Sequence, residues 1–140
     1  MQFQPYLIFN GNCAEAMRFY ERVLGGARID RLMKMGDAPE PCPGMPPEAS
    51  DLVMHARLSI GDRTLMASDT MPGQPYEGMK GFSVVLAYPT VEEARRVFDA
   101  LADGGSVTMP MDKTFWAEAF GMVVDRFGTP WMVNGALAPM

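Results

Sequence analysis

The chain of 140 residues is 48% hydrophobic and 21% charged, the composition of one soluble domain with enough apolar side chains to form a core. It has no run of the roughly 18 apolar residues that a membrane-spanning helix needs, and its first residues lack the basic segment of a signal peptide, so we expect a cytoplasmic protein. The formal net charge of -5, with basic residues scattered along the chain, excludes nucleic acid as an expected partner.

The first half of the chain predicts one helix among four strands. Apolar residues recur at i, i+3, i+4 and i+7 through residues 12–24, which is the spacing of an amphipathic helix. Asn12, with Glu15 three residues later, predicts a capping box at its start, and Gly25-Gly26 predicts its end. The strand-like runs are 3–9, 27–35, 52–60 and 63–69.

A proline-rich segment, Gly36 to Ser50, lies between two of these strands. It contains five prolines, and each proline lacks a backbone N–H and fixes φ, so we predict neither a central strand nor a helix there. A loop of this length in a small domain is either a lid or binding loop or a tolerated surface insertion, and both interpretations stay open.

The second half repeats the order of the first. Residues 90–102 carry the same apolar spacing, Thr90 and Glu93 predict a capping box, and Gly104-Gly105 predicts the helix end. At an offset of 78 residues the two helices align, which indicates an internal repeat. The expected strands are 82–88, 106–111, 119–124 and 130–135. We therefore predict one α+β domain, 1–140, made of two βαβββ modules at about 1–70 and 80–137.

Alternation along residues 52–60 predicts which side chains of that strand face its helix. The side expected to face the helix carries Leu52, Met54, Ala56, Leu58 and Ile60, and the other side carries Val53, His55, Arg57 and Ser59. On this basis His55 and Arg57 lie on the concave side of a curved sheet, where a small molecule could bind.

Four motifs span nearly the whole chain: Pro5 to Gly11, His55 to Gly61, Leu65 to Asp69 and Asp125 to Trp131. With these motifs the repeated unit resembles the vicinal oxygen chelate superfamily, which includes glyoxalase I, bleomycin-resistance proteins, fosfomycin-resistance enzymes and extradiol dioxygenases. The nearer resemblance is to its PhnB-like branch. It implies a curved, mostly antiparallel eight-stranded sheet around a cavity, a fold that hosts several unrelated chemistries.

In metal-dependent members, the resemblance implies ligands on the first and last strands of each module, usually His, Gln or Glu. The corresponding positions here hold Gln4, Pro5 or Tyr6, then Leu65 to Ala67, Phe82 or Ser83, and Met132. Gln4 alone has a donor that suits a divalent cation, because such ions need oxygen or imidazole ligands. We therefore expect no metal centre. Some PhnB-like proteins carry a methyltransferase name, but no glycine-rich turn leads from a strand into a helix here, so we expect no cofactor.

Three polar residues are candidates for the site. His55, the only histidine, is a candidate catalytic acid or base, or else a cavity-wall residue held by a hydrogen bond. Arg57 could bind a carboxylate or phosphate of a ligand, or pair with Asp69 or Asp62. Asp69 could contact a ligand, or cap the end of its strand.

Aromatic residues complete the expected site. Tyr6, Phe115, Trp116 and Trp131 would line a cavity that favours a flat or apolar ligand, although core packing also explains Trp131. Fourteen methionines suit an adaptable binding surface.

The two cysteines, Cys13 and Cys42, are not spaced as metal ligands and are expected to be reduced. Cys13 lies in the first turn of a predicted helix, where the helix dipole could lower its pKa. No histidine is near it in sequence to form a dyad, so we assign it no role in catalysis.

We expect a metal-independent protein that binds or sequesters a small molecule, comparable in role with the drug-binding bleomycin-resistance relatives. The alternative is an enzyme of the superfamily, a lyase, isomerase or dioxygenase, that uses Gln4 with other ligands or His55 as general base. A third class, a pure interaction module, would have no cavity. The resemblance, and methionine-rich apolar loops that would leave patches exposed on a monomer, predict a homodimer.

Overall fold

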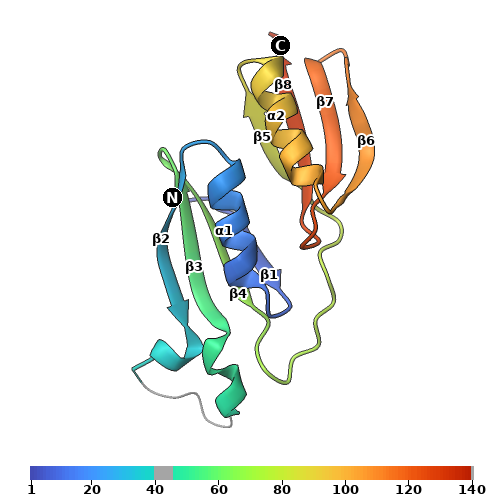
Figure 1. Ribbon diagram of the computed structural model, residues 1–140. Helices are drawn as coiled ribbons and strands as arrows, with labels where there is room; N and C mark the ends of the chain where they lie inside the picture. Colours follow the sequence, from blue (N-terminus) through green and yellow to red (C-terminus); the bar gives the residue numbers. More distant parts are fainter. Residues whose placement is uncertain (40–45, 140) are drawn as a thin grey trace. The chain divides into compact units, whose positions relative to one another are not determined.

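Two βαβββ modules account for the strands and α-helices of this computed structural model, which describes residues 1–39 and 46–139 (Figure 1). The chain divides into two compact units, Met1–Gly78 and Met79–Met140, and each unit contains one module. Cys42 and the middle of the proline-rich segment lie outside the described residues. No helix of the described ranges is long and apolar enough to cross a membrane.

The first module forms a four-stranded sheet with the order β1-β4-β3-β2. β1 pairs with β4 in parallel, and the other two pairs are antiparallel. Its elements are β1 (Tyr6–Phe9), α1 (Cys13–Val23), β2 (Ala27–Lys34), the 3-10 turns η1 (Met35–Asp37) and η2 (Pro47–Asp51), β3 (Val53–Ile60) and β4 (Arg63–Asp69).

The second module has the same topology, with the order β5-β8-β7-β6 and a parallel β5–β8 pair. Its elements are β5 (Val84–Tyr88), α2 (Val91–Ala102), β6 (Ser106–Asp112), β7 (Ala117–Val124) and β8 (Pro130–Leu137). The expected α+β class, the repeated βαβββ order and the mostly antiparallel pairing are confirmed. The hydrogen-bonded pairing divides the expected eight strands between two sheets of four, one in each module.

In the first module, α1 covers one face of the sheet (Figure 1). Its apolar residues recur at helical spacing, and Ala16, Phe19 and Tyr20 are buried. The ring of Phe9 on β1 lies 6.4 Å from that of Tyr20, measured between centroids. In the part of this module that the structure describes, no helix lies against the opposite face of the sheet, and we call it the helix-free face.

In the second module, α2 packs so closely on the sheet that two strand positions exclude a side chain. A Cβ atom on Gly135 of β8 would lie 2.8 Å from the Cβ of Ala94, and one on Gly121 of β7 would lie 2.6 Å from the Phe98 ring. Both distances are shorter than real Cβ contacts. Glycine at these two positions therefore sets the separation of helix and sheet.

The two helix starts differ. The prediction that Thr90 caps α2 is confirmed, because its hydroxyl accepts a hydrogen bond of 3.2 Å from the backbone N–H of Glu93. The Glu93 side chain meets the Thr90 hydroxyl at 3.5 Å and not its backbone N–H, so the second half of the predicted capping box is not formed. The prediction that Asn12 caps α1 is wrong. The backbone of Asn12 has φ -115° and ψ 23°, outside the extended region usual for a capping residue, and its side chain makes no capping hydrogen bond.

The proline-rich segment contains short helical turns at its ends, so the prediction of no helix in it is wrong there. Pro47 stands at the first position of η2, where a residue without a backbone N–H costs no hydrogen bond. At the other end, η1 is tied to the chain before β3 by a 2.8 Å hydrogen bond from the backbone N–H of Met35 to the carbonyl of Leu52.

A β-bulge changes the alternation predicted for β3. Met33 pairs with His55, but the next residue, Lys34, pairs with Val53, so Met54 is an extra residue on β3. An extra residue shifts the following side chain to the other face. Val53, predicted to face away from the helix, is instead in the core with 1% of its surface exposed. Beyond the bulge the prediction is confirmed, because Ala56 and Leu58 are buried.

Candidate functional site

The helix-free face of the first module presents one row of side chains across all four strands. Tyr6 of β1 pairs with Met66 of β4, Met66 pairs with Arg57 of β3, and Arg57 pairs with Arg31 of β2. Paired residues in a sheet have their side chains on the same face. The row, which we call the cross-strand row, therefore runs from an aromatic ring through a thioether to two guanidinium groups.

His55 lies beside this row. It is two residues before Arg57 on β3, which places both side chains on the same face. The imidazole ring lies 5.9 Å from the Tyr6 ring between centroids, and the two planes are inclined by 32°. His55 is half-buried, and within the described residues its side chain has no hydrogen-bond partner. The imidazole is therefore accessible to a ligand on this face.

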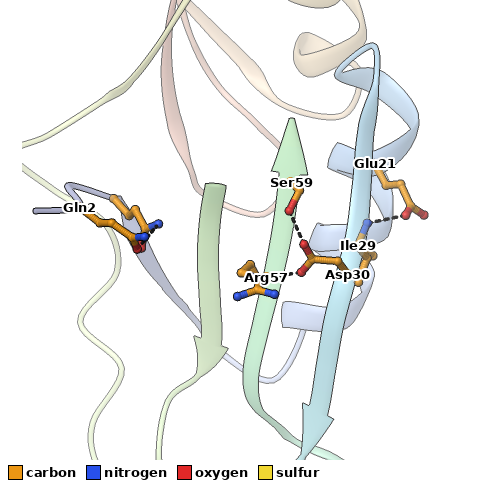
Figure 2. A network of polar contacts seen from close by, with 7 residues as sticks. Gln2, Glu21, Ile29, Asp30, Arg57 and Ser59 are labelled. Atoms are coloured by element: carbon orange, nitrogen blue, oxygen red, sulfur yellow. Dashed lines mark hydrogen bonds and ion pairs between the residues drawn. The ribbon is translucent and has the colours of Figure 1, made fainter. Parts of the chain in front are cut away.

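Arg57 is held by a carboxylate that the sequence did not single out. Its Nε donates a hydrogen bond of 2.7 Å to Oδ1 of Asp30, and the Ser59 hydroxyl donates to Oδ2 of the same carboxylate (Figure 2). The pairing of Arg57 with Asp69 or Asp62, which the sequence left open, is not found. The carboxylate of Asp62 instead lies 3.6 Å from Arg63.

A bulge in β2 places Asp30 there. Ile29 pairs with Leu58, and Arg31 pairs with Arg57, which leaves Asp30 as an extra residue between the two pairs. The hydrogen bonds from Ser59 and then from Arg57 hold the pKa of Asp30 below its ordinary value of 3.8. Asp30 is therefore ionised at neutral pH.

The surroundings of Asp30 are rich in arginine. Arg31 lies directly opposite Arg57, and Arg28 lies opposite Ser59. Arg57 and Arg28 act on the Asp30 carboxylate, and Arg31 is a third arginine in the same part of the sheet, so positive charge exceeds negative charge there. The face therefore carries a local positive charge on a chain whose net charge is negative.

Asp69 has a structural position. Only 3% of its surface is exposed. Its Oδ1 accepts a hydrogen bond from the backbone N–H of Cys13 at 2.9 Å, and its Oδ2 accepts one from Val53 at 2.8 Å. The carboxylate therefore joins β4 to the start of α1 and to the start of β3. Its role is structural, but it caps these two elements and not the end of its own strand, as the sequence had suggested.

In the second module, Phe115 and Trp116 form an aromatic pair. Their rings meet edge to face at 4.9 Å between centroids, and 85% of Phe115 is exposed. The Nε1 of Trp116 donates a hydrogen bond of 3.0 Å to the side-chain oxygen of Asn134 on β8. Trp116 also meets the ring of Phe120 at 5.1 Å. This pair is an accessible aromatic surface whose inner ring is fixed by a hydrogen bond.

Trp131 lies in the core of the second module. It is 1% exposed, and its Nε1 donates a hydrogen bond of 2.8 Å to Oδ2 of Asp125. The Asp125 carboxylate also accepts from the backbone N–H groups of Phe127 and Thr129, and so shapes the turn before β8. Core packing, one of the two roles left open for Trp131, accounts for its position.

Cys13 is buried at the first turn of α1. Burial, and secondarily the charge of Asp69, raises the pKa of its thiol to about 12. The lowered pKa that the sequence suggested for this position is therefore not found. The thiol is therefore protonated at neutral pH and is a poor nucleophile.

The residues at the metal-ligand positions implied by the resemblance do not suit a divalent cation. Leu65 and Ala67 are in the core, and Met66 and Met132 offer only thioethers. Gln4, the one suitable donor, forms a hydrogen bond of 3.2 Å with Gln2 (Figure 2). Within residues 1–39 and 46–139, no three His, Cys, Asp or Glu side chains are grouped as metal ligands.

The structure thus brings together Tyr6, His55 and Arg57 on one sheet face, and places Phe115 and Trp116 together in the other module. Asp30 and Arg31 are the residues of the first group that sequence reasoning missed. Three charged residues, Arg28, Asp30 and Arg31, lie close together in the sequence and could have drawn attention to β2. The contact between Asp30 and Arg57 depends on the bulge, and the sequence does not show the bulge.

Comparison with known proteins assigns the chain to a superfamily. Residues 2–133 match the Glyoxalase/Bleomycin resistance protein/Dioxygenase superfamily, and the chain belongs to that superfamily. Protein YjdN of Escherichia coli (strain K12) is 38% identical in an alignment of 140 positions that covers 96% of this chain and 95% of YjdN.

Two solved structures are similar over almost the whole chain. Protein PA1353 from Pseudomonas aeruginosa superposes with a TM-score of 0.87 at 52% identity, covering 96% of each chain. A PhnB protein from Bacillus cereus superposes with a TM-score of 0.78 at 25% identity, covering 96% of this chain and 98% of that one. The expected family, its fold and the PhnB-like resemblance are confirmed.

Proposed function

We propose that this protein binds a small organic molecule without a metal ion, and that the molecule lies on the helix-free face of the first module. One observation carries the proposal: the cross-strand row and His55 gather an aromatic ring, a thioether, an imidazole and guanidinium groups on one sheet face. Apolar surface with a few convergent polar groups is the usual composition of a ligand site.

The aromatic pair Phe115 and Trp116 is a separate surface, within the second module, that also suits a small organic ligand. An exposed phenyl ring against an indole that is fixed by Asn134 is a surface on which a flat ligand could pack. The metal-free part of the proposal rests on donor chemistry, because the implied ligand positions carry aliphatic and thioether side chains.

The proposal is tested by native mass spectrometry of freshly purified protein. We expect a non-covalent small-molecule adduct that is lost on denaturation. His55→Ala should weaken binding of that molecule by about 1–3 kcal/mol, the usual cost of losing a buried hydrogen-bond partner, while the fold survives. Arg63→Gln, on an exposed hairpin of the same module, is the control and should leave binding unchanged.

Two outcomes contradict the proposal. If no small molecule is found on the native protein and none binds from a library, the ligand-binding function is wrong. If His55→Ala unfolds the protein while binding per folded molecule is unchanged, His55 is a structural residue and the position of the site is wrong.

The second candidate is an enzyme of the superfamily, and the accessible imidazole of His55 beside Arg57 favours it. A histidine with a free ring nitrogen near a cationic side chain could act as general base on an anionic substrate. Conversion of the bound molecule by the wild type, and its loss in His55→Ala, would separate an enzyme from a binding protein.

The Bacillus cereus PhnB protein carries the name of a 3-demethylubiquinone-9 3-methyltransferase. We do not extend that activity to this chain. In the described residues, Gly26 and Gly104 follow the two helices with positive φ, as helix ends require, and do not lead from a strand into a helix as in a nucleotide-like cofactor site.

A further inference from the structure

We propose that the ligand is a small organic anion, and that Arg57, oriented by Asp30 and assisted by Arg31, binds its carboxylate or phosphate group. This inference deepens the proposed function and rests on it, because it names the chemical class of molecule that the helix-free face selects. The anion-binding end of the cross-strand row is the part of the face on β2 and β3.

The guanidinium of Arg57 has N–H donors available for a second partner. Only its Nε is used, in the 2.7 Å hydrogen bond to Asp30. Within the described residues its two terminal nitrogens donate to no acceptor. A guanidinium binds a carboxylate or phosphate through two parallel N–H groups. The two terminal nitrogens of Arg57 are therefore the part that would contact an anion.

Asp30 orients the guanidinium of Arg57. Arginine has a long flexible side chain, and binding through it costs conformational entropy unless the side chain is already held. The Asp30 carboxylate holds Arg57 from one side and is itself held by the Ser59 hydroxyl. Asp30 is thus a positioning residue that would not touch the ligand.

The charges around the row favour an anion as the missing partner. Arg31 lies directly opposite Arg57, and within the described residues it has no ion pair. Arg28 lies near enough to Asp30 to lower its pKa further. One carboxylate cannot neutralise three arginines, so an anion bound here would balance the remaining positive charge of this part of the face.

An unsatisfied hydroxyl lies on the same face. Thr64 of β4 pairs with Ser59 and is two residues from Met66, so its side chain is on the helix-free face. Its Oγ1 is buried and has no hydrogen-bond partner in the described part of the chain. Buried hydroxyls are rarely left unpaired, and a ligand oxygen could pair with this one only if the neighbouring side chains moved aside.

The other end of the row indicates the body of the ligand. Tyr6 and Met66 provide an aromatic ring and a polarizable thioether, with the imidazole of His55 next to Tyr6. Tyr6 and Arg57 stand two strands apart, which is roughly 10 Å at the usual spacing of strands. A molecule with one aromatic ring and one anionic group has about this length.

The test compares anionic probes with a neutral one of the same shape. Phenyl phosphate and benzoate are titrated into the full chain against benzamide, and the Nε–H signals of the arginines are followed by NMR. We expect phenyl phosphate and benzoate to bind at least tenfold more tightly than benzamide, since a charge-assisted pair contributes about that factor or more. The Arg57 signal should shift on binding.

Three variants test the named residues. Arg57→Gln and Arg31→Gln should each weaken phenyl phosphate binding, the first by about 10- to 100-fold. Arg63→Gln makes the same change of charge on the exposed hairpin and should change binding less than twofold. Asp30→Ala is the decisive variant, because the amide oxygen of an asparagine could still accept the hydrogen bond from Arg57. It removes a negative charge, which by charge alone would strengthen anion binding, but loss of the orienting carboxylate should weaken it.

Each contrary result has a separate meaning. If benzamide binds as well as benzoate, or the molecule carried by the purified protein is neutral, the anionic class is wrong while the proposed function stands. If Asp30→Ala binds phenyl phosphate as tightly as the wild type or more tightly, the orienting role of Asp30 is wrong. If neither the probes nor any other small molecule binds, the proposed function fails together with this inference.

Discussion

Asp69 on β4 caps the first turn of α1 from the neighbouring strand, because its carboxylate accepts a 2.9 Å hydrogen bond from the backbone N–H of Cys13. The first residues of a helix have N–H groups without partners inside the helix, and a negative charge there is also favoured by the helix dipole. Asp69 therefore does for α1 what Asn12 was expected to do.

In the second module, the helix is capped by the residue directly before it. Asp69 is paired with Phe9 at the end of β1, and Gly135 is paired with Tyr88 at the end of β5, so the two positions correspond. Gly135 has no side chain to offer, and the hydroxyl of Thr90 caps α2 instead. One module thus uses a long-range cap and the other a cap from the adjacent residue.

We predict that Asp69→Ala lowers the free energy of unfolding by about 3 kcal/mol, because two buried N–H groups lose a charged acceptor. Thr90→Ala, which removes a local cap of α2, should cost about 1 kcal/mol. Urea unfolding of both variants measures the difference. A cost for Asp69→Ala no larger than that for Thr90→Ala would show that the carboxylate is not important for the first module.

A second prediction concerns acid. The pKa of Asp30 is lower in the folded protein than its ordinary value of 3.8, chiefly through the hydrogen bond from Ser59 and then that from Arg57. The ionised carboxylate therefore stabilises the fold at neutral pH, and this contribution is lost as the pH falls below 3.8 toward the folded pKa. The difference in unfolding free energy between wild type and Asp30→Asn should shrink over that range.

The control for this measurement is Asp62→Asn, which removes a carboxylate from an exposed hairpin that has only a 3.6 Å contact with Arg63. Its effect on stability should be small throughout the same range of pH. If the difference between wild type and Asp30→Asn stays constant as acid is added, Asp30 is not stabilised by Ser59 and Arg57.

A third prediction concerns the thiol of Cys13. Burial raises its pKa to about 12, so the native protein contains almost no thiolate at this position at neutral or mildly alkaline pH. We expect iodoacetamide to leave Cys13 unmodified in the native protein and to alkylate it in denaturant, as read by peptide mass spectrometry. Rapid alkylation of native Cys13 would contradict both its burial and its raised pKa.

A fourth prediction is that stability does not depend on a divalent metal. A metal that binds only the folded state must raise the melting temperature, and a chelator must reverse that rise. With Met66 and Met132 at implied ligand positions, we expect no reversible shift with Zn²⁺, Mn²⁺, Ni²⁺ or a chelator. Stoichiometric metal in protein purified without chelator, or a reversible shift of several degrees, would move the protein into the enzyme class.

The fifth prediction is a homodimer. Large apolar side chains such as Val85, Met109 and Phe115 are exposed on the chain, and exposed apolar surface is commonly covered by association. Sedimentation at micromolar concentration should give twice the chain mass of 15.4 kDa. A single species at the chain mass would refute this prediction.

The sequence predicted the elements whose signals are local. Thr90 and Glu93 are three positions apart, and the cap by Thr90 was predicted correctly. The helical spacing and paired glycines placed both helices. The cap of α1 could not be found in this way, because Asp69 and Cys13 are 56 residues apart in the chain. Asn12 and Glu15 matched the local pattern, but the backbone of Asn12 does not have the conformation that the pattern requires.

The candidate site was likewise predictable only where the local sequence pattern determines it. Strand alternation correctly put His55 and Arg57 on one face, because that part of β3 pairs regularly. It failed at Val53, where a bulge adds a residue, and it missed Asp30 for the same reason on β2. Asp30 and Arg57 are 27 residues apart, and only the register of β2 against β3 brings them together.

The bulge at Asp30 has a further consequence for the solution behaviour of the chain. β2 lies at the end of the strand order of its sheet, and such a strand offers unpaired backbone groups to any other extended chain. A flat edge of this kind is a template for aggregation, whereas a bulge twists it and charged side chains along it oppose docking. The irregularity that orients Arg57 thus also protects the edge strand, so a deletion that removed Asp30 and straightened β2 would favour self-association into insoluble material.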